Sequence, residues 1–281
     1  MREEIKNNVS QALAEDIGTG DLTVLLIPEQ QTLVADVMVR EDAVLCGAQW
    51  FELCFRMLCP DIHIEWFAGD GDCLAAQQNI CRISGSARAL LTAERSALNF
   101  LQLLSAVATQ TRRYVDAIDG TQAVIVDTRK TLPGLRLAQK YAVRCGGGVN
   151  HRLGLYDGIL IKENHIAAAG GIRRALETAR AIAPRNVFIQ IEVESPQEMQ
   201  IALDAGALMV LLDNFTLAQL NEAVALRAHH AAKTGRTIIL EASGNIGLDT
   251  VRGVAETGVD RISIGSLTKN IQAVDLSMRF V

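Results

Sequence analysis

Apolar runs of strand length alternate with amphipathic, alanine-rich stretches throughout the second half of the chain. Six runs lack polar alternation, which is typical of parallel strands covered on both faces. They occupy residues 123–129, 157–165, 186–195, 208–215, 237–245 and 261–268. Helical periodicity lies between them at Ile172–Ala183, Pro196–Ala205, Leu217–Ala232 and Leu248–Glu256. The repeated strand–helix order predicts right-handed crossovers and an α/β fold.

Polar and charged residues follow the end of every expected strand. The segments are Arg129-Lys130, Lys162–His165, Glu194, Asp213-Asn214, Ser243–Asn245 and Gly265-Ser266. In α/β barrels the active site gathers at the carboxyl ends of the strands, whereas a doubly wound open sheet clusters such residues at one switch point. The pattern therefore predicts an incomplete, six-stranded α/β barrel with its active site at this edge.

The first part of the chain follows a different pattern. Half-alternating runs predict strands at Leu33–Arg40, His63–Phe67, Gly71–Gln78 and Ile80–Ser86, followed by a long helix from Thr92 to about Ala117. We expect residues 1–106 to form a separate α+β domain of the open-sandwich type and residues 107–271 to form the barrel. The amphipathic C-terminal segment, residues 272–281, is expected to return to the N-terminal domain.

Basic residues concentrate between Asp127 and His165, where seven lysines and arginines face two acids, although the whole chain has a net charge of −5. Such a local concentration favours a small anionic ligand, because a nucleic-acid binder needs a broad basic face. Arg95, in a separate part of the chain, also indicates an anionic ligand. Thr92 is expected to cap its helix, which makes Arg95 the third helical residue, where the helix dipole favours an acid. We interpret Arg95 as a contact to an external anion.

The composition indicates the class of protein and the state of its cysteines. At 49% hydrophobic and 21% charged residues the chain is typical of a globular protein, and no apolar run approaches the ~20 residues of a membrane span. The six cysteines have irregular spacing, without a CxxC pair or a secretory leader. We expect reduced thiols in a cytoplasmic protein.

Several features also have plainer interpretations. Arg136, Lys140 and Arg144 recur at helical spacing and favour a solvated helix face, and Gly146–Gly148 favours backbone geometry. His165 suits a strand end as well as a binding role, His229 and His230 suit a surface helix, and Asp16 and Asp21 suit a turn and a cap. Glu192 and Glu194 share one side of their strand, and we expect Glu194, nearer the carboxyl end, to reach the site. Asn214 is expected to support Asp213.

Seven motifs together resemble one family. They are AEDIGTGDLT (14–23), TAERSALNFLQ (92–102), the 39-residue run Asp127–His165, IEVES, LLDNF, EASGN and DRISIGSLTK. Their combination is similar to the quinolinate phosphoribosyltransferases, the decarboxylating enzymes of de novo NAD synthesis. The resemblance implies that quinolinate and phosphoribosyl pyrophosphate give nicotinate mononucleotide, carbon dioxide and pyrophosphate, with Mg²⁺ as helper ion. It also implies a homodimer in which Arg95 of the partner subunit completes the pocket.

The residues supply groups for both implied substrates. Quinolinate carries two adjacent carboxylates, which suit several cations; the candidates are Arg95, Arg129, His151, Arg152 and Lys162. For phosphoribosyl pyrophosphate, Glu194 and Asp213 are the expected ribose and Mg²⁺ ligands, directly or through water. Lys130 is expected on the phosphate oxygens, and the amides of Ser243, Gly244, Asn245, Gly265 and Ser266 around the 5-phosphate.

The implied mechanism depends on charge. The ring nitrogen attacks C1 of the ribose through an oxocarbenium-like transition state, while Mg²⁺ and Lys130 stabilise the departing pyrophosphate. The quaternised nitrogen then acts as an electron sink for loss of the adjacent carboxylate. Lys162 is expected either to stabilise the developing charge or to protonate the carbon.

Two other functions fit parts of the pattern. A Schiff-base barrel enzyme would use Lys162 as its nucleophile, but a pocket that binds carboxylates opposes the loss of the lysine proton that this chemistry needs. A non-catalytic anion-binding protein would keep the fold, although it should have lost part of the basic set that this chain retains. Borohydride trapping tests the first alternative, and turnover as opposed to binding tests the second.

Overall fold

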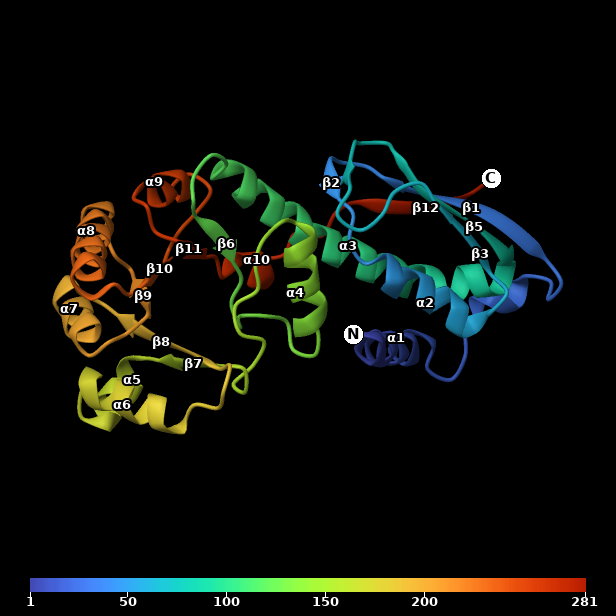
Figure 1. The fold of residues 1–281 in the computed structure, drawn as a ribbon. Coiled ribbons are helices and arrows are strands. Elements are labelled where there is room, and N and C mark those ends of the chain that lie inside the picture. Colours follow the sequence, from blue (N-terminus) through green and yellow to red (C-terminus); the bar gives the residue numbers. More distant parts are fainter. The chain divides into compact units, whose positions relative to one another are not determined.

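The computed structural model describes residues 1–281, which form two compact units (Figure 1). One unit comprises Met1–Arg112, Thr131–Gly147 and Ser266–Val281, and the other comprises Arg113–Lys130 and Gly148–Gly265. We call them the N-terminal unit and the barrel unit. By packing, residues 107–112, 131–147 and 266–271 belong with the N-terminal unit, whereas the division expected from the sequence placed them in the barrel.

The barrel unit contains all six expected strands. They are β6 (Val124–Val126), β7 (Gly158–Ile161), β8 (Phe188–Val193), β9 (Met209–Asp213), β10 (Ile239–Ser243) and β11 (Arg261–Ser263). They form one parallel sheet in the order β6-β11-β10-β9-β8-β7. Because β6 and β7 end this order without pairing with each other, the sheet is a partial α/β barrel, as the sequence predicted.

Helices lie outside this sheet (Figure 1). They are α5 (Glu163–Ala169), α6 (Ile172–Ile182), α7 (Pro196–Asp204), α8 (Leu217–Thr234) and α9 (Val251–Glu256). The expected N-cap of α7 is present, since the Ser195 hydroxyl accepts the Glu198 N–H ahead of a proline at the first helical position. α9 begins three residues later than expected, because Gly247–Thr250 form a hydrogen-bonded turn.

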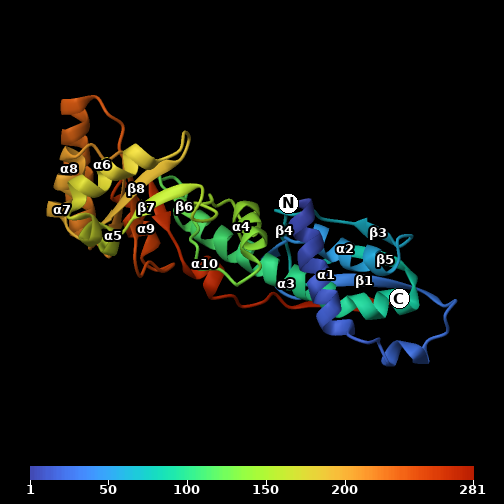
Figure 2. The same cartoon turned by 90° about the horizontal axis from the view of Figure 1, so that it is seen from below.

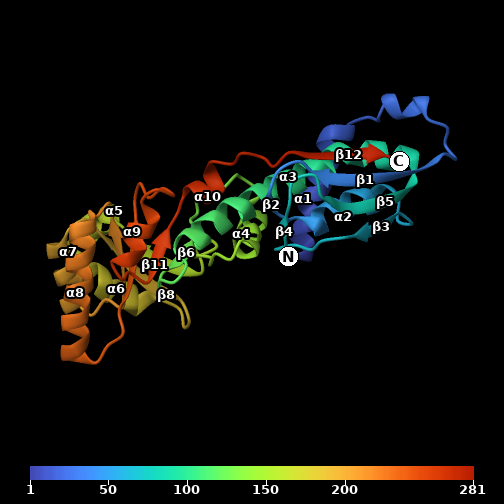
Figure 3. The same ribbon diagram turned by 90° about the horizontal axis from the view of Figure 1, so that it is seen from above.

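The N-terminal unit contains an antiparallel sheet in the order β12-β1-β5-β3. Its strands are β1 (Thr32–Val39), β3 (His63–Trp66), β5 (Asn79–Ser86) and β12 (Leu276–Phe280). β12 pairs with β1 from Leu276 to Phe280, so the end of the chain returns to this unit as predicted (Figure 3). A two-stranded pair, β2 (Ala43–Val44) and β4 (Cys73–Leu74), is separate from this sheet.

Four α-helices and a 3-10 turn complete the unit together with most of α3 (Ala87–Ala117), which crosses the division at Arg112. They are α1 (Arg2–Ile17), η1 (Thr23–Leu26), α2 (Ala48–Leu58), α4 (Arg136–Cys145) and α10 (Ser266–Lys269). α1 packs against α2 (Figure 2). No helix in the structure combines the length and apolar character that crossing a membrane requires.

The long helix begins earlier than the sequence indicated. α3 starts at Ala87, directly after β5, so Thr92 lies inside it and Arg95 is its ninth residue. The Thr92 hydroxyl donates to Asp21 Oδ2 at 2.9 Å instead of capping the helix. The argument that Arg95 sits against the helix dipole was therefore wrong, although Arg95 is exposed. Asp21 is a cap, as expected, because its Oδ1 accepts the Thr23 and Val24 N–H groups at η1.

Two further expectations differ from the structure. The strand expected at Gly71–Gln78 is reduced to β4, because Ala75–Gln78 form a turn in which Gln77 has a φ of 67°. The solvated face expected on α4 is also wrong at Lys140, which is only 1% exposed. Its neighbour Gln139 is fully buried and donates to the Thr268 carbonyl at 2.8 Å, so this side of α4 packs inward.

Candidate active site

A cavity of about 770 Å³ lies within the barrel unit, where it extends from the carboxyl ends of the strands along β7 and one side of α6. Five of the expected basic residues line it: Arg129, Lys130, His151, Arg152 and Lys162. Polar groups on the neighbouring strands line it as well, namely Asp127, Glu192, Glu241, Ser243 and Ser263. Residues that are 136 positions apart in the sequence thus meet because parallel strands end at the same edge of the sheet.

Two arginines give the cavity its positive character. Arg152 is half-buried, and its Nη1 donates to the Gly158 carbonyl at 3.0 Å. Burial lowers the pKa of Arg152, and the nearby charge of Arg129 lowers it further. Arg129 Nε is closed off from solvent and has no hydrogen-bond acceptor. The two guanidinium groups thus repel each other in the free protein, and an anion between them would relieve that repulsion.

Hydrogen bonds fix the orientation of His151. Its Nδ1 accepts the Arg152 N–H at 2.7 Å, and its Nε2 lies 2.8 Å from Gln190 Oε1. Because Nδ1 must accept, the proton of the neutral ring is assigned to Nε2, which donates to Gln190. Asp127 Oδ1 accepts the His151 backbone N–H at 2.8 Å. His151 therefore lines the cavity with both ring nitrogens held by neighbouring protein groups.

A buried polar network behind His151 went unrecognised in the sequence. Gln190 Nε2 donates to Glu241 Oε2 at 3.2 Å, and the Ser263 hydroxyl donates to Glu241 Oε1. The Arg261 Nε lies 3.1 Å from Glu241 Oε2, at an angle too poor for a hydrogen bond. Gln190 and Glu241 are fully buried. Each of these two residues interrupts a largely apolar strand in the sequence. That pattern could have predicted the network, since charged and amide side chains are buried only with hydrogen-bonding partners.

Lys162 is paired within the cavity. Its Nζ lies 2.8 Å from Glu192 Oε2, and the Glu192 side chain is only 10% exposed. The Lys162 N–H donates to His165 Nδ1 at 3.0 Å and thereby caps α5, so His165 has a structural role besides lining the cavity.

Glu192 occupies the position that Glu194 was expected to fill. Glu194 does not line the large cavity; it borders a smaller cavity of about 140 Å³, which Glu192 also lines, and its N–H donates to Glu198 Oε2. β8 ends at Val193 and the chain turns into α7 at Ser195, which takes Glu194 away from the inner face. The structure therefore differs from the expectation in one respect, since Glu192 and not Glu194 lines the large cavity.

Tight backbone turns follow β9 and β10. Asn214 supports Asp213 as expected, because its Nδ2 donates to Asp213 Oδ2 at 2.7 Å. Asn245 Nδ2 lies 3.3 Å from Asn214 Oδ1. Gly244 has a φ of 101°, and a Cβ there would lie 2.2 Å from Asn214 Oδ1, so this turn requires glycine. Of this group Ser243 lines the cavity, and Asp213 lies at its strand end without lining it.

The remaining expected site residues lie as follows. A Cβ on Gly265 would come within 3.2 Å of Lys130 Cδ, so the glycine leaves room for the exposed lysine side chain. Ser266 begins α10, and Arg95 is exposed on α3, both in the N-terminal unit.

Comparison with known proteins gives consistent matches over nearly the whole chain. Residues 20–105 match the N-terminal domain of quinolinate phosphoribosyl transferase, and residues 107–279 match its C-terminal domain. A probable nicotinate-nucleotide pyrophosphorylase [carboxylating] of Bacillus subtilis is 41% identical over 98% of this chain and 93% of that protein. The enzyme of Mycobacterium leprae is 40% identical over 97% and 96%. The chain belongs to the quinolinate phosphoribosyltransferase family.

Solved structures of the family share the fold. The nicotinate-nucleotide pyrophosphorylase of Francisella tularensis superposes with a TM-score of 0.93 at 41% identity, covering 100% of this chain and 97% of that one. NadC from Streptococcus pyogenes gives 0.93 at 36% identity, covering 100% and 98%. Membership in the family makes this chain an enzyme of the phosphoribosyltransferase class, in NAD biosynthesis, and confirms the resemblance read from the motifs.

Proposed function

We propose that the large cavity of the barrel unit joins quinolinate to phosphoribosyl pyrophosphate and releases nicotinate mononucleotide, carbon dioxide and pyrophosphate. The observation that carries this proposal is the pair Arg129 and Arg152, two partly buried cations beside one cavity, with an unpaired Nε on Arg129. Like charges held together in this way suit a ligand with two negative charges. Quinolinate, with adjacent carboxylates, is such a ligand.

The basic residues of the cavity have different roles in binding quinolinate. Arg129 and Arg152 provide guanidinium groups whose planar geometry matches carboxylates. His151 holds the Arg152 backbone through Nδ1, and so aligns the clamp without binding the substrate itself. Lys162 supplies a third positive charge, tethered at 2.8 Å by Glu192.

The second substrate, phosphoribosyl pyrophosphate, carries phosphates and a ribose. Exposed Lys130 serves as a point charge for phosphate oxygens, and Gly265 keeps the backbone beside it free of a side chain. Within the barrel unit, the turn at Ser243–Asn245 and the loop at Gly265 offer backbone amides for the 5-phosphate. We assign the ribose hydroxyls to Glu192 in place of Glu194, because Glu192 lines the cavity. Asp213, at the end of the neighbouring strand β9, is the second carboxylate.

The donor set fits Mg²⁺. This ion binds through one or two carboxylates together with substrate phosphates, and Glu192 and Asp213 end adjacent strands of the sheet. Mg²⁺ would neutralise charge on the pyrophosphate as it leaves.

The chain's own residues would then act in two stages. As the pyridine nitrogen bonds to C1 of the ribose, the C1–O bond to pyrophosphate breaks, and Lys130 stabilises the departing oxygens. Carbon dioxide then leaves, and the electron pair of the C2–carboxylate bond stays on C2, where the adjacent positive ring nitrogen stabilises it. Lys162, held in place by Glu192, stabilises the resulting negative charge or delivers the proton to C2.

Two wider features belong to the same proposal. The enzyme acts as a homodimer in the cytoplasm, and Arg95 of the partner subunit adds a further cation to each cavity. Exposure of Arg95 on α3 supports this, since the side chain is available to a second chain.

A coupled assay tests the function. Purified protein is incubated with phosphoribosyl pyrophosphate, Mg²⁺ and either quinolinate or nicotinate, and nicotinate mononucleotide is quantified by chromatography. We expect turnover with quinolinate and none with nicotinate, because nicotinate has a single carboxylate and would leave one guanidinium group unpaired. Equal turnover of both acids would refute the dicarboxylate clamp. A folded protein that binds quinolinate without turnover would instead be an anion-binding protein.

A further inference from the structure

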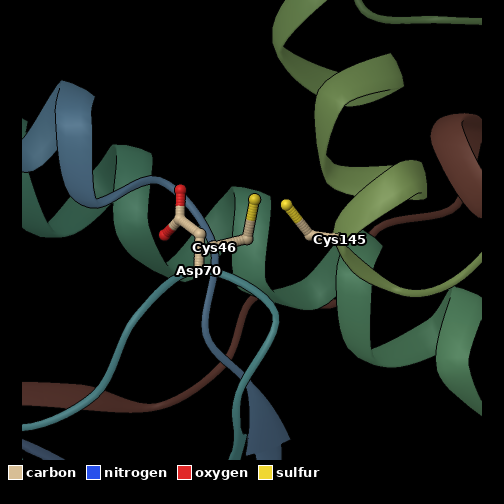
Figure 4. A group of neighbouring side chains, drawn as sticks. All are labelled: Cys46, Asp70 and Cys145. Carbon is tan, nitrogen blue, oxygen red and sulfur yellow. The ribbon is translucent and has the colours of Figure 1, made fainter.

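A second cluster of reactive side chains lies in the N-terminal unit, formed by Cys46, Asp70 and Cys145 (Figure 4). The two sulfurs and one carboxylate oxygen all lie within 4.8 Å of one another. Cys46 follows β2 just before α2, and Cys145 is the last residue of α4. Figure 4 shows the two sulfurs directed toward each other from these separate segments. Both cysteines are free thiols, as are the other four.

We propose that Cys46 and Cys145 form a redox-active pair that a peroxide converts into an intrachain disulfide. The two sulfurs need to approach from within 4.8 Å to about 2.0 Å, the length of a disulfide bond. The backbone next to Cys145 packs closely against α3, since a Cβ on Gly146 would clash with the Ala108 carbonyl. The approach therefore falls to the two cysteine side chains. This site is independent of the transferase reaction.

The surroundings of the two sulfurs differ in a way that suits such chemistry. Cys145 is partly exposed, whereas Cys46 is fully buried. A hydrogen bond from Cys46 lowers the pKa of Cys145, and the Arg144 charge acts in the same direction, against burial and the Asp70 charge, which raise it. Burial raises the pKa of Cys46 well above its usual range. Cys145 is thus the thiol that attacks, and Cys46 is the one that keeps its proton until the second step.

The chemistry balances with hydrogen peroxide as the oxidant. The Cys145 thiolate attacks one peroxide oxygen, the O–O bond breaks, and the departing hydroxide takes a proton to become water. Cys145 is then a sulfenic acid. The Cys46 sulfur attacks the Cys145 sulfur and expels hydroxide, which takes the Cys46 proton to form a second water. Two thiols are oxidised to one disulfide, and one peroxide is reduced to two waters.

A metal site is a weaker interpretation of the same cluster, because Asp70 already has partners. Its Oδ1 accepts the Gly47 and Ala48 N–H groups at 3.0 Å each, and its Oδ2 accepts the Tyr141 hydroxyl at 2.7 Å. Structural zinc takes four ligands, whereas this cluster offers three. Asp70 therefore holds the start of α2 and the Tyr141 side chain beside the two sulfurs.

Peptide mapping of the full-length protein tests the proposal. Reduced, desalted wild-type protein is treated with micromolar hydrogen peroxide, quenched with iodoacetamide and digested with trypsin without reduction. The expected product joins residues 41–56 to residues 145–152, two hydrogens lighter than the separate peptides, with fragmentation placing the bond on Cys46 and not on Cys54. Dithiothreitol should abolish this product.

Variants sharpen the result. Cys145→Ser should eliminate the linked peptide, and Cys46→Ser should eliminate it while leaving a Cys145 sulfenic acid that dimedone traps. Cys73→Ser, at an exposed cysteine, is the matched control and should retain the link. Recovery of Cys145 fully alkylated in the wild type, at peroxide concentrations that oxidise Cys73, would overturn the proposal. A metal ion bound to the purified protein through both cysteines, found by elemental analysis, would overturn it as well.

Discussion

Replacing Arg129 with methionine tests whether its guanidinium group binds the ligand or stabilises the fold. The substitution keeps an unbranched side chain but removes the guanidinium group whose Nε is shielded from solvent without an acceptor. An unpaired buried donor costs about 1–3 kcal/mol, and Arg129 also repels Arg152. The free energy of unfolding of Arg129→Met should therefore stay within about 1 kcal/mol of wild type or rise, unlike most substitutions of partly buried residues.

Quinolinate binding should respond in the opposite direction. Truncating one member of a buried charge pair costs about 2–5 kcal/mol, which corresponds to about 30- to 4,000-fold in the dissociation constant. Urea unfolding measures the stability, and isothermal titration calorimetry with quinolinate measures the affinity. Arg252→Met, which removes exposed contacts to Glu256 and to the Asp119 carbonyl, is the matched control; it should leave the quinolinate affinity unchanged and the stability within about 1 kcal/mol. A variant destabilised by more than about 2 kcal/mol that still binds quinolinate normally would refute the role assigned to Arg129.

Four further outcomes are expected. Lys130→Ala should lower kcat about 100- to 1,000-fold with little change in quinolinate affinity, because Lys130 acts on the departing pyrophosphate; equal losses in both, by steady-state kinetics and calorimetry, would contradict that role. Glu192→Gln should reduce turnover at least about tenfold by leaving Lys162 without its ion partner, whereas Glu194→Gln should stay within about twofold; the reverse ranking would restore the choice of Glu194. Gly244→Ala should cost about 2–4 kcal/mol in urea unfolding, since its φ of 101° and the contact with Asn214 both oppose a Cβ; an unchanged midpoint would show that the turn adapts. Chelation with EDTA should abolish turnover, and added Mg²⁺ should restore it; full activity in EDTA would remove Mg²⁺ from the mechanism.

The barrel strands could be predicted because the sequence of each strand alone carries the pattern that identifies it. A parallel strand covered on both faces needs an apolar run, and all six runs became strands of one sheet. Three cations of the cavity were equally visible, since Arg129, Lys130 and Lys162 each follow a strand end in the sequence. Arg129, Lys130 and Lys162 meet through the topology alone, which the strand–helix order had indicated.

Features that depend on distant partners could not be predicted in this way. Thr92 looked like a helix cap, but its hydroxyl bonds to Asp21, 71 residues away, while α3 continues directly from β5. Glu241 is buried because Ser263 and Gln190, from other strands, donate to it, and one sequence does not reveal that register. The choice between Glu192 and Glu194 depended on where β8 ends, a boundary that periodicity locates only to within a few residues.

The buried network explains how the cavity holds two like charges before a substrate arrives. Arg152 is fixed through His151 and the Gly158 carbonyl, so it cannot swing away from Arg129 when the cavity is empty. Gln190 and Glu241 in turn fix the His151 ring. Preorganised charges of this kind reduce the stability of the free protein but avoid reorganisation when the ligand binds. Because a dianion removes the repulsion between the arginines, quinolinate should raise the thermal unfolding midpoint of the wild-type protein far more than that of Arg129→Met.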